Sequence, residues 1–361
     1  MNPALAPRAF VAVAVVAVLG LLAALFAAPH ERYYRFQAYD SGTTRKADWI
    51  YERLWFDPTP VDVALVGTSR TGGALSGPQI EAGYCALTGR RARVANLSIP
   101  ETGRNLHYVI AKEAVRAKRP ALVVVELNET EARKPHRGFV FLADARDALA
   151  APVAINVNYF SDLARLPGRQ ARLLFETAAR RPTLRARFDP AAYAGAHLDR
   201  TRELDLIDGR RIFRAGADSA EALDAQRRRR LAKASARHVL PAPLRVLEYR
   251  FSRRYLEAIE DLAASADARV DYVFVPAWRA PAMDAALLAE LGVDGEPMRV
   301  ATDLTDDAPF WFDDTHLSAS GAARASRDFA AALADRHPRL GAPGDCPTFI
   351  ASAVDRDAAL D

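Results

Sequence analysis

The most strongly apolar part of the chain is an uncharged run from Ala9 to Ala28. About 20 such residues, at a rise of about 1.5 Å each, are enough for a helix to cross a hydrocarbon core. A cleavable signal peptide is the alternative, but its apolar stretch is shorter and ends in a small-x-small cleavage site. Here Phe26 fits such a site badly, and Pro29 would follow the cleaved bond. We therefore expect residues 1–28 to form an uncleaved membrane anchor.

The charges around this run give a mixed signal about its orientation. Only Arg8 and the terminal amine precede it, whereas Arg32, Arg35, Arg45 and Lys46 follow it. A literal count of positive charges opposes a cytoplasmic N-terminus. A very short N-terminal tail before a large domain is nevertheless a common layout for exported anchored enzymes. We expect the domain to be exported, on the periplasmic side of a bacterial inner membrane.

Further along the chain, short apolar runs alternate with amphipathic stretches. Four runs are typical of buried parallel strands, and they cover residues 61–66, 93–97, 121–127 and 270–275. Helices are expected over residues 77–88, 105–118, 250–266 and 320–335. This alternation predicts an α/β domain with a parallel sheet over residues 59–338.

Three stretches fall outside this pattern. Residues 29–58 are polar and aromatic without a clear period, which predicts a juxtamembrane stem with a short helix over 49–55 that packs on the domain. Residues 133–250 are rich in Arg, Pro and Ala and contain no convincing strand run, which predicts a helical insertion. Residues 339–361 are expected to form a loose C-terminal tail.

Composition narrows the classes of function. The chain has 361 residues and a formal net charge of +4, a mild excess that does not indicate nucleic-acid binding. Its two cysteines, Cys85 and Cys346, form no C-x-x-C pair or Cys/His cluster, so a structural zinc site is not expected. In an exported domain they could form one disulfide, or they could remain separate thiols; the sequence leaves both open.

The first candidate for chemistry is Ser69, in the segment Gly67-Thr68-Ser69-Arg70 that follows the first strand. Ligands of parallel sheets bind beyond the carboxyl ends of the strands, and a serine there exposes its hydroxyl beside a helix N-terminus. A helix cap is the simpler interpretation of a lone serine. A phosphate loop is excluded because no Gly-Lys-Ser/Thr follows. The α/β-hydrolase elbow is absent because Thr71 replaces its second glycine.

The second candidate is the segment Asp313-Asp314-Thr315-His316, just before the last helix. A carboxylate three residues before a histidine can orient one ring nitrogen while the other faces a serine. This spacing favours Asp313 as the orienting residue, with Asp314 as the alternative. Taken alone, the segment is more typical of a helix cap followed by a surface histidine.

Together these segments resemble the SGNH, or GDSL-like, hydrolase superfamily. Gly67-Thr68-Ser69-Arg70 is similar to its first sequence block, in a variant found in membrane-anchored branches. Asp313-x-x-His316-Leu317-Ser318-x-x-Gly321 is similar to its last block. The order of these segments and their place at strand ends support the resemblance.

Two further blocks of the superfamily have weaker counterparts. Gly103 matches the glycine of the second block, and Asn128 matches the asparagine of the third, Gly-x-Asn. Glu126 replaces the glycine of that third block, and Glu129 rather than Asp follows the asparagine. Asn105 is therefore a second candidate for the amide.

The resemblance implies a three-layer α/β/α, flavodoxin-like fold and a serine-hydrolase mechanism. Ser69, Asp313 and His316 would form a catalytic triad. The oxyanion hole would consist of the backbone N–H groups of Ser69 and Gly103 and the side chain of Asn128. No metal and no organic cofactor is required.

The resemblance also suggests a class of substrate. The anchor and the Gly-Thr-Ser-Arg variant are similar to anchored SGNH proteins of alginate O-acetylation and teichoic-acid D-alanylation, which work beside a multipass membrane acyltransferase. We expect an exported O-acetyltransferase or esterase that acts on a cell-envelope or secreted polysaccharide, with such an acyltransferase as partner. The alternatives are a lipid esterase or thioesterase, and a non-catalytic scaffold that binds a glycan or a membrane partner.

Several other arginines and two tryptophans could contact a ligand, but most of them have a simpler structural interpretation. The run Arg227–Arg230 is expected to be a solvated helix face rather than a contact for an anionic glycan or lipid headgroups. Arg70 either shapes the pocket or is solvated. Trp278 and Trp311 are expected to pack in the core rather than to stack on a sugar.

Overall fold

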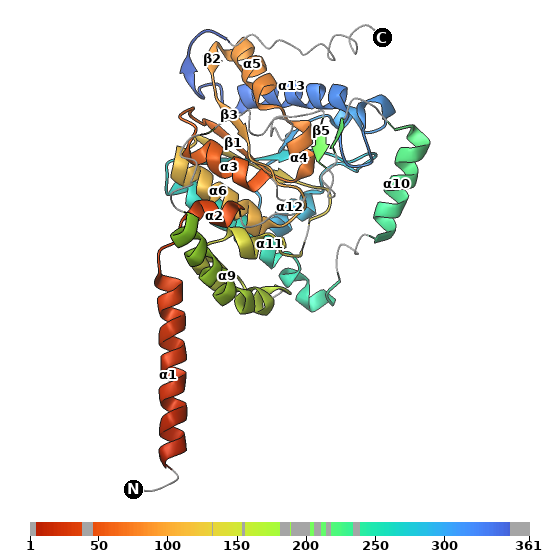
Figure 1. Ribbon diagram of the computed structural model, residues 1–361. Helices are drawn as coiled ribbons and strands as arrows, with labels where there is room; N and C mark the ends of the chain where they lie inside the picture. Colours follow the sequence, from red (N-terminus) through yellow and green to blue (C-terminus); the bar gives the residue numbers. More distant parts are fainter. Residues whose placement is uncertain are drawn as a thin grey trace.

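The computed structural model describes residues 5–37, 46–131, 133–153, 156–180, 188, 203–205, 211–213, 218–233 and 239–346. Helix α1 (Leu5–Ala27) extends away from the folded domain as a single rod (Figure 1). Its stretch Pro7–Ala27 is long and apolar enough to cross a membrane, and it is not buried inside the protein. The predicted apolar N-terminal helix is therefore present.

The centre of the domain is a sheet of five parallel strands in the order β3-β1-β4-β7-β8. The strands are β1 (Val63–Val66), β3 (Val94–Asn96), β4 (Leu122–Leu127), β7 (Arg269–Phe274) and β8 (Met298–Arg299). Four of them were predicted; β8 is too short to give a sequence signal. Counted along the chain, the order is 2-1-3-4-5, in which the winding direction reverses between β1 and β4. Ligands of open α/β sheets bind at such a reversal, beyond the strand ends.

Helices cover both faces of the sheet, because its strands are apolar on both sides. On β1, Val63 and Leu65 pack into one core and Ala64 and Val66 into the other. The first core is closed by α4 (Ser69–Ala74), α5 (Gly77–Thr88) and α13 (Ala319–Arg336). The second is closed mainly by α6 (Arg104–Lys118), α11 (Arg250–Ala264) and α12 (Ala285–Leu291) (Figure 1). The mixed α/β fold with a parallel sheet is confirmed.

The described part of the segment after the anchor packs into the domain. It contains α2 (Arg32–Gln37) and α3 (Lys46–Trp55), and their aromatic side chains belong to the second core. The buried residues of these helices include Tyr33, Phe36, Trp49, Ile50 and Leu54. The short helix predicted over 49–55 is present as part of α3 and packs on the domain. The sequence did not reveal α2, because buried tyrosine and charged residues interrupt the apolar period. Burial of these helices ties the domain directly to the end of α1.

The insertion is helical, but not wholly so. In its described residues the helices are α7 (Phe139–Leu142), α8 (Ala145–Leu149), α9 (Tyr159–Arg180), α10 (Ala220–Lys233) and the 3-10 turn η3 (Ala242–Leu247). It also contains an antiparallel pair, β5 (Glu203–Asp205) and β6 (Arg211–Phe213), which corrects the prediction that it has no strand. Strands this short have too few residues to show an alternating pattern, although Asp208-Gly209 between them is a hairpin signal.

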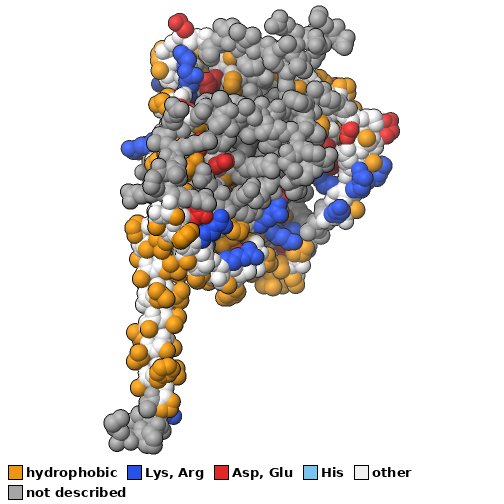
Figure 2. All heavy atoms as spheres, in the orientation of Figure 1, with side chains coloured by type: hydrophobic (Ala, Val, Ile, Leu, Met, Phe, Trp, Pro, Cys, Tyr) orange, Lys and Arg blue, Asp and Glu red, His pale blue; other side chains and the backbone are white. Residues whose placement is uncertain are grey.

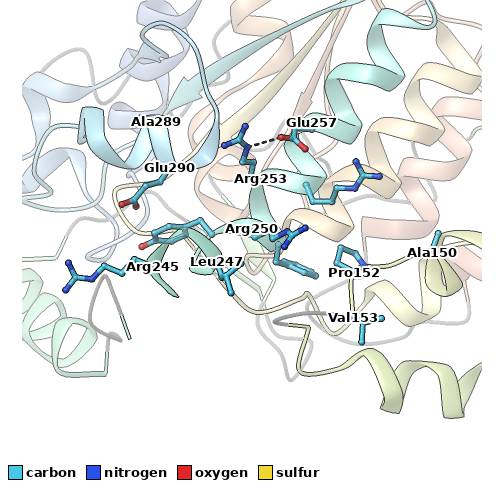
Figure 3. Close-up of a pocket in the computed structure, with 13 residues that line it drawn as sticks. Ala150, Pro152, Val153, Arg245, Leu247, Arg250, Arg253, Glu257, Ala289 and Glu290 are labelled. Atoms are coloured by element: carbon cyan, nitrogen blue, oxygen red, sulfur yellow. Dashed lines mark hydrogen bonds and ion pairs between the residues drawn. The ribbon is translucent and has the colours of Figure 1, made fainter. Parts of the chain in front are cut away.

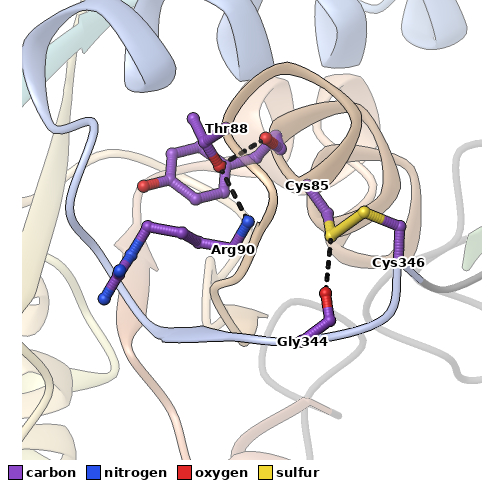
Figure 4. Close-up of a disulfide and its surroundings, with 6 residues drawn as sticks. Cys85, Thr88, Arg90, Gly344 and Cys346 are labelled. Atoms are coloured by element: carbon purple, nitrogen blue, oxygen red, sulfur yellow. Dashed lines mark hydrogen bonds between the residues drawn. A yellow bond between two sulfur atoms is a disulfide. The ribbon is translucent and has the colours of Figure 1, made fainter.

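The described part of the C-terminal tail is not loose either. Strand β9 (Ala342–Pro343) pairs antiparallel with β2 (Arg90–Arg91) at the end of α5. The chain passes so close there that a Cβ on Gly341 would lie 1.9 Å from the Arg91 carbonyl oxygen. A disulfide then joins Cys346 to Cys85 on α5, with 5.4 Å between the Cα atoms (Figure 4). Of the two alternatives for the cysteines, the structure has the disulfide. The rest of the tail, 347–361, lies outside the described residues.

This disulfide closes a loop that contains nearly the whole domain, with a sequence separation of 261 residues. We expect the double substitution Cys85→Ser and Cys346→Ser to lower the free energy of unfolding by about 2–4 kcal/mol, because the unfolded chain loses its longest constraint. Denaturant unfolding of the purified protein in detergent measures this. A reductant should weaken the wild type by a similar amount and leave the double variant unchanged. Equal stability of oxidised wild type and variant would contradict the prediction.

Candidate active site

Ser69 lies at the carboxyl end of β1, as the first residue of α4. Thr68 caps this helix by accepting a hydrogen bond from the Arg70 N–H. Since the cap is Thr68, the Ser69 hydroxyl is not used as a helix cap, which was the simpler interpretation of the sequence. Its side chain is half-buried at the edge of the sheet.

The Ser69 hydroxyl meets His316 across 247 residues of sequence. Its Oγ lies 2.8 Å from Nε2 of His316. The other ring nitrogen, Nδ1, lies 2.8 Å from Oδ2 of Asp313 and 2.9 Å from Oδ1. With the ring proton on Nδ1, Asp313 accepts from the imidazole and Nε2 is left to accept from the serine. The three side chains therefore have the connectivity of a Ser-His-Asp triad.

A tight turn sets the geometry of the acid and the base. The His316 carbonyl accepts hydrogen bonds from the N–H groups of Phe312 and Asp313, which folds the segment back on itself. Oδ1 of Asp313 in turn accepts from the N–H groups of Thr315 and His316, at 2.8 Å each. Burial opposes ionisation of Asp313, but the hydrogen bonds from His316 and Thr315 outweigh it and hold the pKa of Asp313 well below its ordinary value. These contacts therefore favour the ionised form of Asp313 beside the ring.

Asp314, the alternative orienting residue, faces a different partner. Its Oδ2 accepts from Nε of Arg230 at 2.6 Å, and Arg230 also lies 3.6 Å from Glu129. Arg230 lies on α10. A second residue of this helix, Gln226, also contacts the turn that contains Asp313 and His316, because its side chain accepts a hydrogen bond from the Asp314 N–H. The prediction that Arg227–Arg230 is only a solvated face is therefore wrong for Arg230. The sequence of four consecutive arginines does not indicate which of them forms an ion pair with a distant residue.

Arg70 joins the serine turn to the end of β4. Its guanidinium forms two hydrogen bonds to the Glu129 carboxylate, at 2.6 and 3.0 Å. Burial opposes ionisation of Glu129, but the Arg70 charge outweighs it and lowers the pKa of Glu129. Of the two interpretations of Arg70, the structure favours the one in which it shapes the site.

Glu126 explains where the chain departs from the third sequence block. Its carboxylate is fully buried under the serine turn. It accepts four hydrogen bonds, from the backbone N–H and the hydroxyl of both Thr68 and Thr71, at 2.6–3.3 Å. A Cβ on Gly67 would lie 2.4 Å from this carboxylate, so Gly67 is needed for the close approach. Glu126 therefore holds the residues on both sides of Ser69.

We expect Glu126→Gln to lower kcat for ester cleavage by about tenfold to a hundredfold with little change in KM. The amide cannot accept all four hydrogen bonds, so the turn shifts, and a misplacement of about 1 Å can cost about a hundredfold. Steady-state kinetics with an activated acetyl ester measure this. Glu113→Gln is the matched control, because Glu113 is equally buried but pairs with Arg35 on the far side of α6. A fall in both KM and kcat of Glu126→Gln would contradict a positioning role for Glu126. An equal loss of kcat in Glu126→Gln and Glu113→Gln would also contradict it.

Three residues at the carboxyl ends of neighbouring strands have hydrogen-bond donors that are not used within the described structure. Within the described residues, no acceptor is present for the N–H groups of Ser69 and Gly103, nor any hydrogen-bond partner for the Asn128 side chain. These residues follow β1, β3 and β4, which are adjacent in the sheet. The loop that contains Gly103 is joined to the serine turn where the Ile99 N–H donates to Gly67. Unused donors at a strand edge are what an oxyanion hole requires.

Gly103 has a steric reason to be glycine. A Cβ there would lie 2.4 Å from Cβ of His136 and 2.5 Å from its backbone nitrogen. His136 is buried, and its N–H donates to Oδ1 of Asn105 at 2.9 Å. Asn105 is fully buried, and its Oδ1 also accepts from the Leu106 N–H. Asn105 thus joins two backbone segments through its Oδ1, while its Nδ2 is buried without a hydrogen-bond partner in the described structure. The Asn128 side chain, whose Oδ1 is likewise buried without a partner among the described residues, remains the other candidate for the amide.

Trp278 and Trp311 are fully buried and pack edge to face, which confirms the core interpretation. Within the described residues, no group of three or more His, Cys, Asp or Glu side chains is placed to hold a metal ion. The chain matches no protein-family model, and no curated protein is similar to it in sequence. Its function is therefore inferred from its own residues.

Proposed function

We propose that this chain is a membrane-anchored serine esterase or O-acyltransferase of the SGNH type, with the three-layer flavodoxin-like fold of that superfamily. The observation that carries the proposal is the contact of 2.8 Å between the Ser69 hydroxyl and the His316 ring, with Asp313 behind it. The strand order and the position of Ser69 beside the reversal of the sheet support the fold.

The mechanism follows from the geometry. His316 takes the hydroxyl proton as the Ser69 oxygen bonds to the acyl carbon, and Asp313 stabilises the resulting imidazolium. The negative carbonyl oxygen receives hydrogen bonds from the Ser69 and Gly103 N–H groups and the Asn128 amide. His316 then returns the proton to the departing alcohol, which leaves an acyl-serine. Water or a second alcohol, activated by the same histidine, releases the acyl group.

The proposed location is the periplasmic side of a bacterial inner membrane. Helix α1 has the length and composition of a span, and α2 and α3 bury the chain that follows it into the domain. The disulfide between Cys85 and Cys346 supports export, because such bonds persist in oxidising compartments and are rare in the cytosol.

The proposed substrates are acyl esters, foremost acetyl esters, of a cell-envelope or secreted polysaccharide. The support for a sugar is the resemblance of the serine and histidine segments to anchored proteins of polysaccharide acylation. A multipass membrane acyltransferase is the partner that this role requires when the chain acts as a transferase. Ser69 and His316 are both partly exposed, so that an acyl group on a large substrate can reach them.

The two alternative functions receive less support. A scaffold without catalysis would be favoured by a serine and a histidine too far apart to hydrogen-bond, and the distance here is 2.8 Å. A lipid esterase would be favoured by an apolar channel in the insertion that leads to Ser69. The insertion does have an apolar hollow between α7 and α9, but its lining includes none of Ser69, Asp313 and His316.

Incubation of the full-length protein with an activated acetyl ester, with and without acceptor oligosaccharides, tests the proposal. Acetylated sugar would identify a transferase, and acetate alone an esterase. Long-chain acyl esters cleaved in preference to acetyl esters would favour the lipid esterase. Turnover that is absent with every ester, or unchanged by Ser69→Ala, would overturn the proposal.

A further inference from the structure

We propose that the face of the domain beside the end of α1 docks on an anionic lipid surface, through the outer side of α9 and an arginine-lined groove at the start of α11. This inference rests on the proposed anchoring by α1. It adds that the folded domain itself lies on the bilayer, rather than hanging from a flexible tether.

The chain holds α9 at the level where α1 would leave the membrane. Helix α1 has 23 residues, about 34 Å at 1.5 Å per residue, so a bilayer core of about 30 Å would take up nearly all of it. Glu31, four residues past its end, donates its backbone N–H to the Thr177 hydroxyl on α9 at 3.0 Å. Helix α9 also lies directly beside the end of α1 (Figure 1). The depth of α1 in the membrane therefore determines how close α9 lies to the membrane surface.

The outer side of α9 is apolar as well as its inner side. Leu166 and Leu173 pack inward, yet Phe160 and Phe175 remain 74% and 73% exposed. The other exposed residues of α9 are small or basic, and they are Ser161, Ala164, Arg165, Gly168, Ala171, Arg172, Ala178 and Ala179. The acidic residues of α9 do not oppose an anionic surface, because Asp162 is buried and Glu176 pairs with Arg172. Phenylalanine with arginine on one helix face is typical of interfacial helices.

The apolar surface continues beyond α9. Val153 and Val157, just before the helix, are 54% and 73% exposed. Figure 2 shows apolar side chains gathered at the lower edge of the domain over α9, with Lys and Arg side chains above them. The hollow of about 350 Å³ between α7 and α9 opens on the same side, with Arg165 and Arg172 in its lining. An exposed apolar surface of this extent marks an interaction site.

An arginine-lined groove of about 1040 Å³ adjoins this surface and shares Val153 with it (Figure 3). Its lining contains four arginines, Arg245, Arg250, Arg253 and Arg254, against two glutamates. Arg253 pairs with Glu257 at 2.8 Å. The other three have no ion-pair partner in the described part of the chain. Free guanidinium groups beside apolar side chains match a phosphate headgroup on an acyl chain, and arginine binds phosphate in a bidentate manner.

Site-specific fluorescence in lipid nanodiscs tests this docking with the full-length chain. Because Cys85 and Cys346 are bonded to each other, a single new cysteine at Phe160 or Phe175 can be labelled with an environment-sensitive dye. Leu87→Cys is the matched control, since Leu87 is 62% exposed on α5, at the opposite end of the domain (Figure 1). In nanodiscs with phosphatidylglycerol, we expect nitroxide lipids to quench the dyes at 160 and 175 several-fold more than the dye at 87.

Charge variants test the groove. Arg250→Glu with Arg254→Glu should at least halve the quenching at 160, whereas Arg327→Glu with Arg339→Glu on the α13 side should leave it unchanged. Both pairs should keep wild-type turnover of a soluble ester. Wild-type quenching should also be stronger with phosphatidylglycerol than with phosphatidylcholine alone, and millimolar inorganic phosphate should not displace it.

Equal quenching of the dyes at 160, 175 and 87 would overturn the proposal. It would also be overturned if the dye at 160 became buried only after another membrane protein was added to the nanodiscs. A dye at Leu19, in the middle of α1, separates the two hypotheses. If it is quenched by deep nitroxides while the dyes at 160 and 175 are not, the anchor stands and docking fails. If the dye at Leu19 is not quenched, the anchor itself fails.

Discussion

Replacement of Ser69 by alanine is expected to reduce kcat for an activated acetyl ester by a factor on the order of 10⁵ or more. The hydroxyl is the nucleophile in the proposed mechanism, and no other hydroxyl contacts Nε2 of His316 in the described part of the chain. Members of a triad act as a unit. His316→Ala should therefore cost a similar factor, and the double variant should lose little more than either single one. Stopped-time product assays at high enzyme concentration can measure the residual rates.

Two controls separate loss of chemistry from loss of structure. Ser161→Ala removes a hydroxyl on the exposed side of α9 and should keep wild-type turnover. A serine-directed fluorophosphonate should label the wild type at Ser69, and label neither Ser69→Ala nor His316→Ala. Unchanged thermal unfolding of the variants would show that the fold is intact. Wild-type turnover by Ser69→Ala would place the chemistry elsewhere in the protein.

The parallel sheet could be predicted because its strands are buried on both faces. The run 121–127 begins with five apolar residues in succession, which is typical of a buried parallel strand when it lies between two helical stretches. The meeting of Ser69 and His316 could also be anticipated, since strand ends and the last helix of such a sheet share one edge. Both predictions combine local sequence patterns with the general rules for how strands and helices are connected in parallel sheets.

What could not be predicted depends on contacts between distant residues. Glu126 looked like a departure from the third sequence block until its four hydrogen bonds to Thr68 and Thr71 were seen. The residues 29–58 looked like a stem because polar groups such as Glu52, which accepts a hydrogen bond from the Tyr33 hydroxyl, meet their partners only in the folded domain. Arg230 looked solvated because its partners, Asp314 and Glu129, lie far along the chain. Buried polar groups carry no period, so a sequence pattern cannot reveal them.

Removal of the Asn128 side chain is the second change with a large expected effect. Asn128→Ala should lower kcat by about a hundredfold to a thousandfold with little change in KM, because the lost hydrogen bond is needed mainly when charge develops on the acyl oxygen. Stability should change little, since the Asn128 side chain has no hydrogen-bond partner in the described structure. Kinetics with the activated ester and denaturant unfolding together measure both quantities.

Asn105→Ala should show the reverse pattern, and the comparison tests which amide faces the substrate. Its Oδ1 accepts from the N–H groups of Leu106 and His136, and leaving such buried donors unpaired costs about 1–3 kcal/mol each. We therefore expect a clear loss of stability in Asn105→Ala and a smaller loss of kcat than in Asn128→Ala. If Asn105→Ala instead loses kcat while Asn128→Ala keeps it, the oxyanion donor comes from the start of α6 rather than from the end of β4. The substrate would then bind toward β3, away from the reversal point of the sheet.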